Sequence, residues 1–71
     1  MNAVKILKVV DSYIIGEIKH KTPPYRLYLI IDQESDIYAV VEWAHKKEQQ
    51  EIIEKLQRNA KKIMYDILKS L

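Results

Sequence analysis

The sequence predicts an α+β domain: an antiparallel four-stranded sheet, made of two β-hairpins, with one long C-terminal amphipathic helix packed on one face. Short runs rich in β-branched and aromatic residues, separated by turn-forming residues, fill the first two thirds of the chain. From about residue 44 onward, apolar residues instead recur at spacings of three and four, which is the helical period. A chain of 71 residues is also too short to build two cores, so we predict a single domain over residues 1–71.

The first hairpin is predicted over residues 4–10 and 13–19. Asp11 and Ser12 lie between these runs and suit a tight turn. Residues 20–24 end in two prolines, which lack backbone donors and hold the preceding backbone extended. This segment cannot continue a strand ladder, so we expect it to be a connection.

The second hairpin is predicted over residues 25–31 and 37–43. Residues 32–36, which separate the two runs, are all polar, and Asp and Ser favour turns because their side chains hydrogen-bond to nearby backbone groups. The short loop makes these two strands antiparallel neighbours in the sheet.

The helix is predicted to begin near Ala44 and to run to the end of the chain. Its apolar stripe consists of Ile52, Ile53, Leu56, Ala60, Ile63, Met64, Ile67, Leu68 and Leu71. Acidic residues precede basic ones by four positions in two pairs, Glu51 with Lys55 and Glu54 with Arg58, which supports a helix. No Ser, Thr, Asp or Asn near Ala44 marks an N-cap, so the start is placed to within about three residues.

Alternation along the strands predicts which side chains face the helix. The odd-numbered positions of the second hairpin are all apolar or amphipathic and are expected to share the helix-covered face. These positions are Tyr25, Leu27, Leu29, Ile31, Ile37, Ala39, Val41 and Trp43. The first hairpin is expected to add Leu7, Val9, Ile14 and Ile18 to the same face.

The opposite sheet face is predicted to be apolar as well. Its expected residues are Ile6, Val10, Tyr13, Ile15, Tyr28, Ile30, Tyr38 and Val40. Because a monomer seldom exposes so large an apolar patch, homodimerisation through this face is the simplest account. We expect an interface formed by Ile6, Tyr13, Ile15, Tyr28, Ile30, Tyr38 and Val40. Lys8, Glu17 and Arg26, expected on the same face, weigh against a dimer, and one hairpin folding over the other within a single chain is the alternative.

Positive charge is concentrated in the C-terminal third of the chain. Residues 1–44 carry five Lys or Arg against six Asp or Glu, whereas residues 45–71 carry seven against four. The exposed side of the predicted helix forms a basic ridge made of Lys55, Arg58, Lys61, Lys62, Tyr65 and Lys69. Such a ridge suits the phosphate backbone of DNA or RNA, but cations near the C-terminus of a solvated helix also complement its dipole. Tyr28 and Tyr38 have the spacing of base-stacking residues on a sheet, although the isoleucines around them favour packing.

No combination of residues indicates catalysis or a bound metal or cofactor. His45 and Glu42 come nearest to an acid–base pair, but no nucleophile or oxyanion donor accompanies them. Asp32 and Asp36 with Glu42 lack the lysine that a magnesium-dependent nuclease site favours, and both aspartates suit turns. With two histidines and no cysteine, a structural zinc site is incomplete.

The composition predicts an ordered globular protein of the cytoplasm. Hydrophobic residues make up 48% and charged residues 31% of the chain, and the apolar runs are too short to cross a bilayer. The lack of cysteine agrees with a reducing compartment. The predicted function is a non-catalytic interaction module that self-associates through the sheet face left open by the helix. The alternative is a nucleic-acid-binding protein that uses the basic face of the C-terminal helix.

Overall fold

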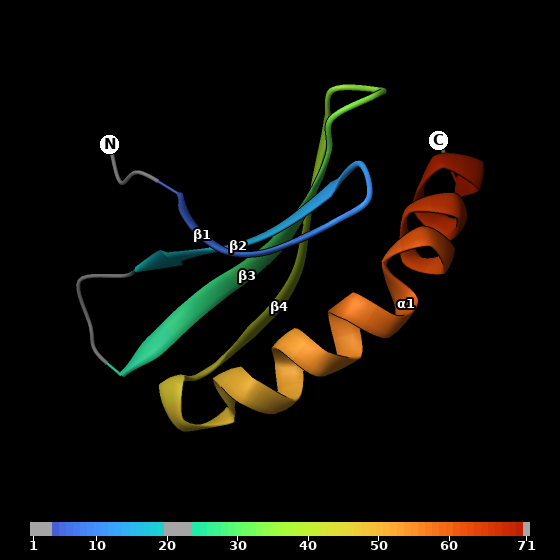
Figure 1. Ribbon diagram of the computed structural model, residues 1–71. Coiled ribbons are helices and arrows are strands. Elements are labelled where there is room, and N and C mark those ends of the chain that lie inside the picture. The colour runs from blue at the N-terminus through green and yellow to red at the C-terminus, as the bar shows by residue number, and fades with distance from the viewer. Residues whose placement is uncertain (1–3, 20–23, 71) are drawn as a thin grey trace.

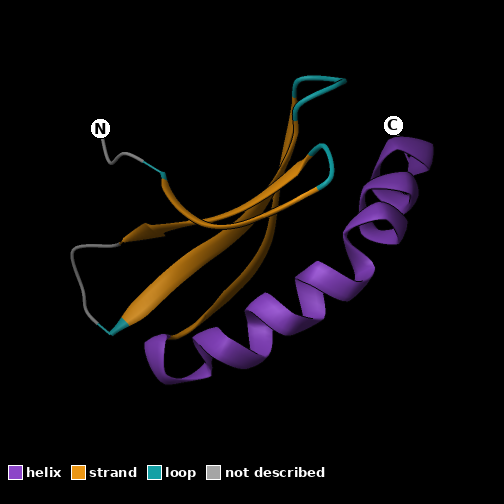
Figure 2. Cartoon of the chain, viewed as in Figure 1, coloured by secondary structure: helices purple, strands orange, loops and turns teal. Residues whose placement is uncertain are grey.

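The protein is a two-layer α+β domain in which one helix covers one face of a four-stranded antiparallel sheet (Figures 1 and 2). The computed structural model describes residues 4–19 and 24–70. Its elements are β1 Lys5–Val10, β2 Tyr13–Lys19, β3 Tyr25–Asp32, β4 Ile37–His45, the 3-10 turn η1 Lys46–Glu48 and α1 Gln49–Ser70. The sheet order is β1-β2-β3-β4. The predicted fold class is confirmed, while most of the predicted connection, residues 20–23, lies outside the described residues.

Both hairpin turns are set by aspartates. Asp11 and Asp36 have φ angles of 54° and 56°, in the left-handed region that Asp tolerates better than most residues. The carboxylate of Asp32 accepts hydrogen bonds from the backbone N–H of Glu34 at 3.0 Å and from the hydroxyl of Ser35 at 2.8 Å. These bonds fix the second turn in the way expected of an Asx turn. Both loops therefore lie where the polar residues of the sequence predicted them.

The helical segment begins at Lys46, within three residues of the predicted start at Ala44, but it opens with η1 and becomes α-helical only at Gln49, because β4 continues to His45. The N-cap is a residue type that the sequence analysis did not consider. His45 accepts a hydrogen bond at Nδ1 from the backbone N–H of Lys47 at 3.1 Å. The N–H of Lys46 donates to the carbonyl of Pro24 at 2.7 Å. An imidazole nitrogen thus does here what a Ser, Asp or Asn oxygen usually does at a helix start.

The core lies between α1 and one face of the sheet. Four buried helix residues, Ile52, Leu56, Ala60 and Met64, pack against that face. The sheet contributes Ile15, Tyr28 and Ile30, which are all 0% exposed, together with Ala39 and Ala44. Tyr13, Val10 and Ile37 pack against this cluster from its edge.

The predicted assignment of faces is therefore wrong for most of the sheet. Ile15, Tyr28, Ile30 and Tyr13 were expected on the open face but lie on the helix-covered one. The face assumed to be covered in β2 and β3 is the open one, since Ile14 pairs with Ile31 on the side away from the core. Of the predicted interface set, Ile6, Tyr38 and Val40 do lie on the open face.

A β-bulge breaks the strict alternation of faces within β4. Tyr28 pairs with Glu42 while the next residue, Leu29, pairs with Val40, so Val41 is an extra residue in β4. An extra residue reverses which side chains face the helix on its two sides. In β4, the odd-numbered positions before the bulge face the core, and the even-numbered positions after the bulge face the core. A second irregularity, at Leu7 in β1, has the same effect.

Candidate functional site

The sheet face away from α1, here called the open face, contains no charged side chain among its described strand residues. Residues that pair across antiparallel strands share a face, and the registers give four rows. The rows are Val9, Ile14, Ile31 and Tyr38; Ile6, Gly16, Leu29 and Val40; Ile18, Leu27 and Trp43; and Tyr25 with His45. These rows therefore contain no Lys, Arg, Asp or Glu, and α1 does not cover them, although Leu29 at the centre of the face is only 2% exposed.

Large apolar side chains on the open face are strongly exposed. Tyr38 is 62% and Val40 64% exposed, and Ile6 and Val9 are more than half exposed. An aromatic group occupies one end of the face: the rings of Tyr25 and Trp43 stack with centroids 5.6 Å apart. The ring of His45 meets Tyr25 edge-on at 5.4 Å.

The glycine of β2 shapes the same face. A Cβ at Gly16 would stand 2.6 Å from Cγ1 of Val4 and 3.2 Å from the carbonyl oxygen of Lys5. A larger residue at this position would therefore force the Val4 side chain and the backbone at Lys5 to shift. The side chain of Val4 lies over Gly16, and the exposed apolar side chains of the open face surround this covered position.

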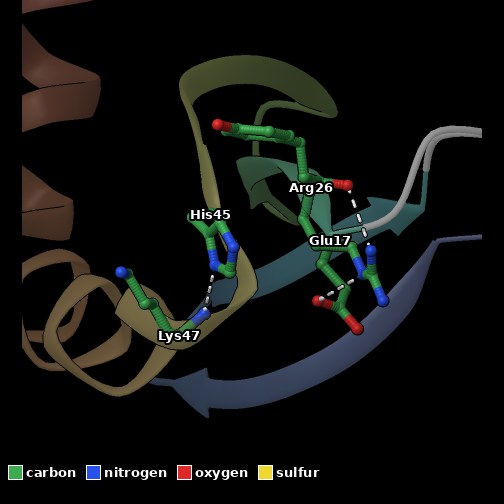
Figure 3. Close-up of polar contacts among 5 residues, drawn as sticks. Glu17, Arg26, His45 and Lys47 are labelled. Atoms are coloured by element: carbon green, nitrogen blue, oxygen red, sulfur yellow. Dashed lines mark hydrogen bonds and ion pairs between the residues drawn. The ribbon is translucent and has the colours of Figure 1, made fainter.

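The charges of the sheet lie on the opposite, helix-covered face. Glu17, Arg26 and Asp32 are all less than 10% exposed. Arg26 Nε lies 3.9 Å from Glu17 Oε2, and Arg26 Nη1 donates a hydrogen bond to the carbonyl oxygen of Tyr25 at 3.1 Å (Figure 3). Lys8 pairs with Ile15 and so shares this side as well. All three charges that weighed against a dimer in the sequence analysis are thus absent from the open face.

Tyr28 shares the buried site of Glu17, which is its partner across the strands. Among the described residues, neither the Tyr28 hydroxyl nor Glu17 Oε2 has a hydrogen-bond partner. Burial, and then the nearby carboxylate of Glu17, raise the pKa of Tyr28 above its ordinary value of 10.0. Both effects disfavour the phenolate, so the fold holds this tyrosine in its neutral form.

The raised pKa of Tyr28 predicts a loss of stability in alkali. The unfolded chain releases the tyrosine proton near pH 10, whereas the folded chain retains it to higher pH, so the stabilisation is complete below pH 10 and falls as the pH rises above it. Urea denaturation between about pH 9 and about pH 11 should therefore show a shallower decline for Tyr28→Phe than for the wild type. Tyr65→Phe, at an exposed position, is the control and should leave the slope unchanged. Equal slopes for Tyr28→Phe and the wild type would contradict the assignment.

The structure divides the basic ridge. Lys55 Nζ lies 3.4 Å from Glu42 Oε2, and Lys55 borders a groove whose other charged residues include Glu48, Glu51 and Glu54. Arg58 borders this groove too, but it also lines a second cleft, of about 480 Å³, together with three more ridge residues, Lys61, Lys62 and Tyr65. Lys69 is exposed but does not line this cleft.

Residues far away in the sequence complete the cleft. Tyr13 and Asp32, which pair at the end of the sheet, line it together with Met64 and Leu68 of α1. Sequence reasoning assigned Tyr13 to the sheet interface and Met64 and Leu68 to the apolar stripe. Only the packing of α1 along the sheet places these residues beside the basic ones.

The other candidate residues are separated or already engaged. Glu42 pairs with Tyr28 on the helix-covered face, whereas His45 pairs with Tyr25 on the open face, so the two do not form an acid–base pair. Both carboxylate oxygens of Asp32 accept hydrogen bonds within the turn. Within the described residues, no helix is long and apolar enough to cross a membrane.

Comparisons of the chain with protein-family models, with curated proteins and with solved structures found no match.

Proposed function

We propose that the protein is a non-catalytic interaction module that self-associates face to face through the open face of its sheet. The observation that supports this proposal is the inverted polarity of the sheet. The charged residues of β2 and β3 lie on the helix-covered face, while the described strand residues on the other face include no Lys, Arg, Asp or Glu and expose residues such as Tyr38, Val40 and Trp43. A soluble domain with one covered sheet face ordinarily shows the reverse arrangement.

A second copy of the chain is the occupant that best fits this surface. Interfaces of homodimers are more apolar than ordinary protein surface, and their centres are depleted of charge. An uncharged face is compatible with itself under a two-fold axis, because no like charges are brought together. A standard interface buries about 800 Å² per partner, roughly a sixth of the 5130 Å² surface of this chain. Such burial also adds to the small core that a domain of this size can build.

Two tyrosines of nearly equal exposure allow a matched test. Tyr38 on the open face is 62% exposed and Tyr65 on α1 is 64% exposed. We expect the wild type to sediment as a dimer and Tyr38→Glu to sediment as a folded monomer, its dimer weakened at least about 100-fold by two buried, unpaired carboxylates. Tyr65→Glu should remain dimeric.

Analytical ultracentrifugation from micromolar to millimolar protein measures the difference. A wild type that stays monomeric throughout would refute self-association. An equal loss of dimer in both variants would show that the open face is not the interface.

Nucleic-acid binding is the second candidate function. The observation that favours it is the cleft, which places Tyr13 of the sheet beside Arg58, Lys61 and Lys62 of the helix. Cations next to an aromatic ring are the combination that binds single-stranded nucleic acid, with phosphates on the cations and bases on the ring.

A further inference from the structure

The cations of the cleft are not neutralised within the described part of the chain. Arg58, Lys61 and Lys62 are exposed and take part in no ion pair there, unlike Lys55, which pairs with Glu42; of the three, only Arg58 also borders the acidic groove beside Lys55. The carboxylate of Asp32 also lines the cleft and is hydrogen-bonded within its own turn, and its single negative charge leaves the three cations in excess. Three unpaired positive charges around one cleft favour an anionic ligand, and they favour it more than an evenly solvated helix face would.

The inner surface of the cleft is apolar and aromatic. Met64, which is 1% exposed, belongs to the core beneath it, and Leu68 lies one helical turn further along α1. Tyr13 and Tyr65 approach from the sheet and the helix respectively. A bare inorganic anion would leave these groups in contact with water. The lining therefore fits a ligand that joins a flat aromatic body to its negative charge.

The charges also give such a ligand an orientation. Asp32 belongs to the sheet end of the cleft, whereas the cations all belong to α1. The carboxylate of Asp32 repels a phosphate and the cations of α1 attract it, so we expect the phosphate to lie on the helix side of the cleft. Each carboxylate oxygen of Asp32 uses one hydrogen bond in the turn, which leaves acceptor capacity for an N–H group of a base.

We propose that this cleft binds one nucleotide, with the base against Tyr13 and Tyr65 and the phosphate held by Arg58, Lys61 and Lys62. The volume of about 480 Å³ lies within the usual range for small-ligand sites. This inference deepens the nucleic-acid candidate and does not depend on self-association. The nucleotide has two sources with the same chemistry, a free mononucleotide or one unit of a single strand.

Charge-matched variants separate the cleft from the rest of the ridge. Lys61→Gln with Lys62→Gln removes two charges from the cleft, and Lys55→Gln with Lys69→Gln removes two charges from outside it. We expect the first pair to weaken binding at least about tenfold and to reduce its salt dependence, while the second pair has little effect. Tyr65→Ala should also weaken binding about tenfold or more, because a stacked base loses its ring.

The measurement is calorimetry with the four 5′-mononucleotides, and fluorescence anisotropy with labelled single strands and duplexes of DNA and RNA, at about 50 and about 200 mM salt. Binding that depends on Tyr65 and on the cleft lysines supports the proposal. Binding in the calorimetry identifies a free mononucleotide as the ligand, and binding in the anisotropy identifies a unit of a single strand. If both lysine pairs weaken binding equally and Tyr65→Ala has no effect, the proposed nucleotide site in the cleft is refuted. Binding of phosphates along the whole basic ridge would then remain supported. No binding in any arm at low salt would overturn both.

Discussion

We expect Ile30→Glu to unfold the protein and Val40→Glu to leave it folded. Ile30 is 0% exposed and pairs with Ile15 and Ala39 in the core under α1. A carboxylate there has no partner, and burying it costs several kcal/mol, a large part of the roughly 5–15 kcal/mol that stabilises a domain. Val40 lies on the adjacent strand but on the open face, where it is 64% exposed.

Far-UV circular dichroism and urea denaturation of the two variants at one protein concentration test this pair. Val40→Glu should keep the wild-type spectrum, and Ile30→Glu should lose it. A folded Ile30→Glu protein together with an unfolded Val40→Glu protein would mean that the helix covers the other face of the sheet. Because glutamate is introduced in both variants and the two positions lie on adjacent strands, the difference in stability depends mainly on which face of the sheet each position occupies.

The order and type of the elements could be predicted because local chemistry determines them. Asp11 and Asp36 adopt left-handed backbone angles in the two hairpin turns, and the change in apolar period marks where strands give way to the helix. The tight first turn also determined the register of its hairpin, in which Val10 pairs with Tyr13. These features depend on residues close together in the chain.

The faces of the sheet could not be predicted, because both sets of alternating positions are apolar. Ile30 and Ile31 differ in no local property, yet only Ile30 lies under the helix. The extra residue at Val41 reverses the alternation within β4, and neither valine nor its neighbours signal a bulge. Glu17 and Arg26 were expected on the open face by the same alternation, whereas both are buried on the helix-covered face.

The candidate site was predictable only in part, for a similar reason. The helical period placed Arg58, Lys62 and Tyr65 on one side of α1, and they do line one cleft. The pairing of Lys55 with Glu42, which lies 13 residues away, and the position of Tyr13 are tertiary contacts. No pattern within the helix could have shown which cations are neutralised.

The buried pair of Glu17 and Arg26 gives the second large prediction: Arg26→Met should destabilise the fold by about 3–5 kcal/mol, because it leaves the Glu17 carboxylate buried without a partner charge. The side chains are 3% and 9% exposed, so water cannot replace the lost arginine. Urea denaturation at a fixed protein concentration measures the loss. The exposed pair Lys55–Glu42 is the control, and Lys55→Met should cost less than about 1 kcal/mol.

The double variant Glu17→Leu with Arg26→Met should recover most of that stability. The separation of 3.9 Å is long for an ion pair, and Glu17 Oε2 has no hydrogen bond within residues 4–19 and 24–70 to offset its removal from water. Two apolar side chains of similar size avoid both desolvation costs, so the pair itself contributes little net stability although each partner depends on the other. A single Arg26→Met variant no less stable than Lys55→Met would show that Glu17 is solvated. A double variant as unstable as the single one would show that the two residues contribute through separate contacts.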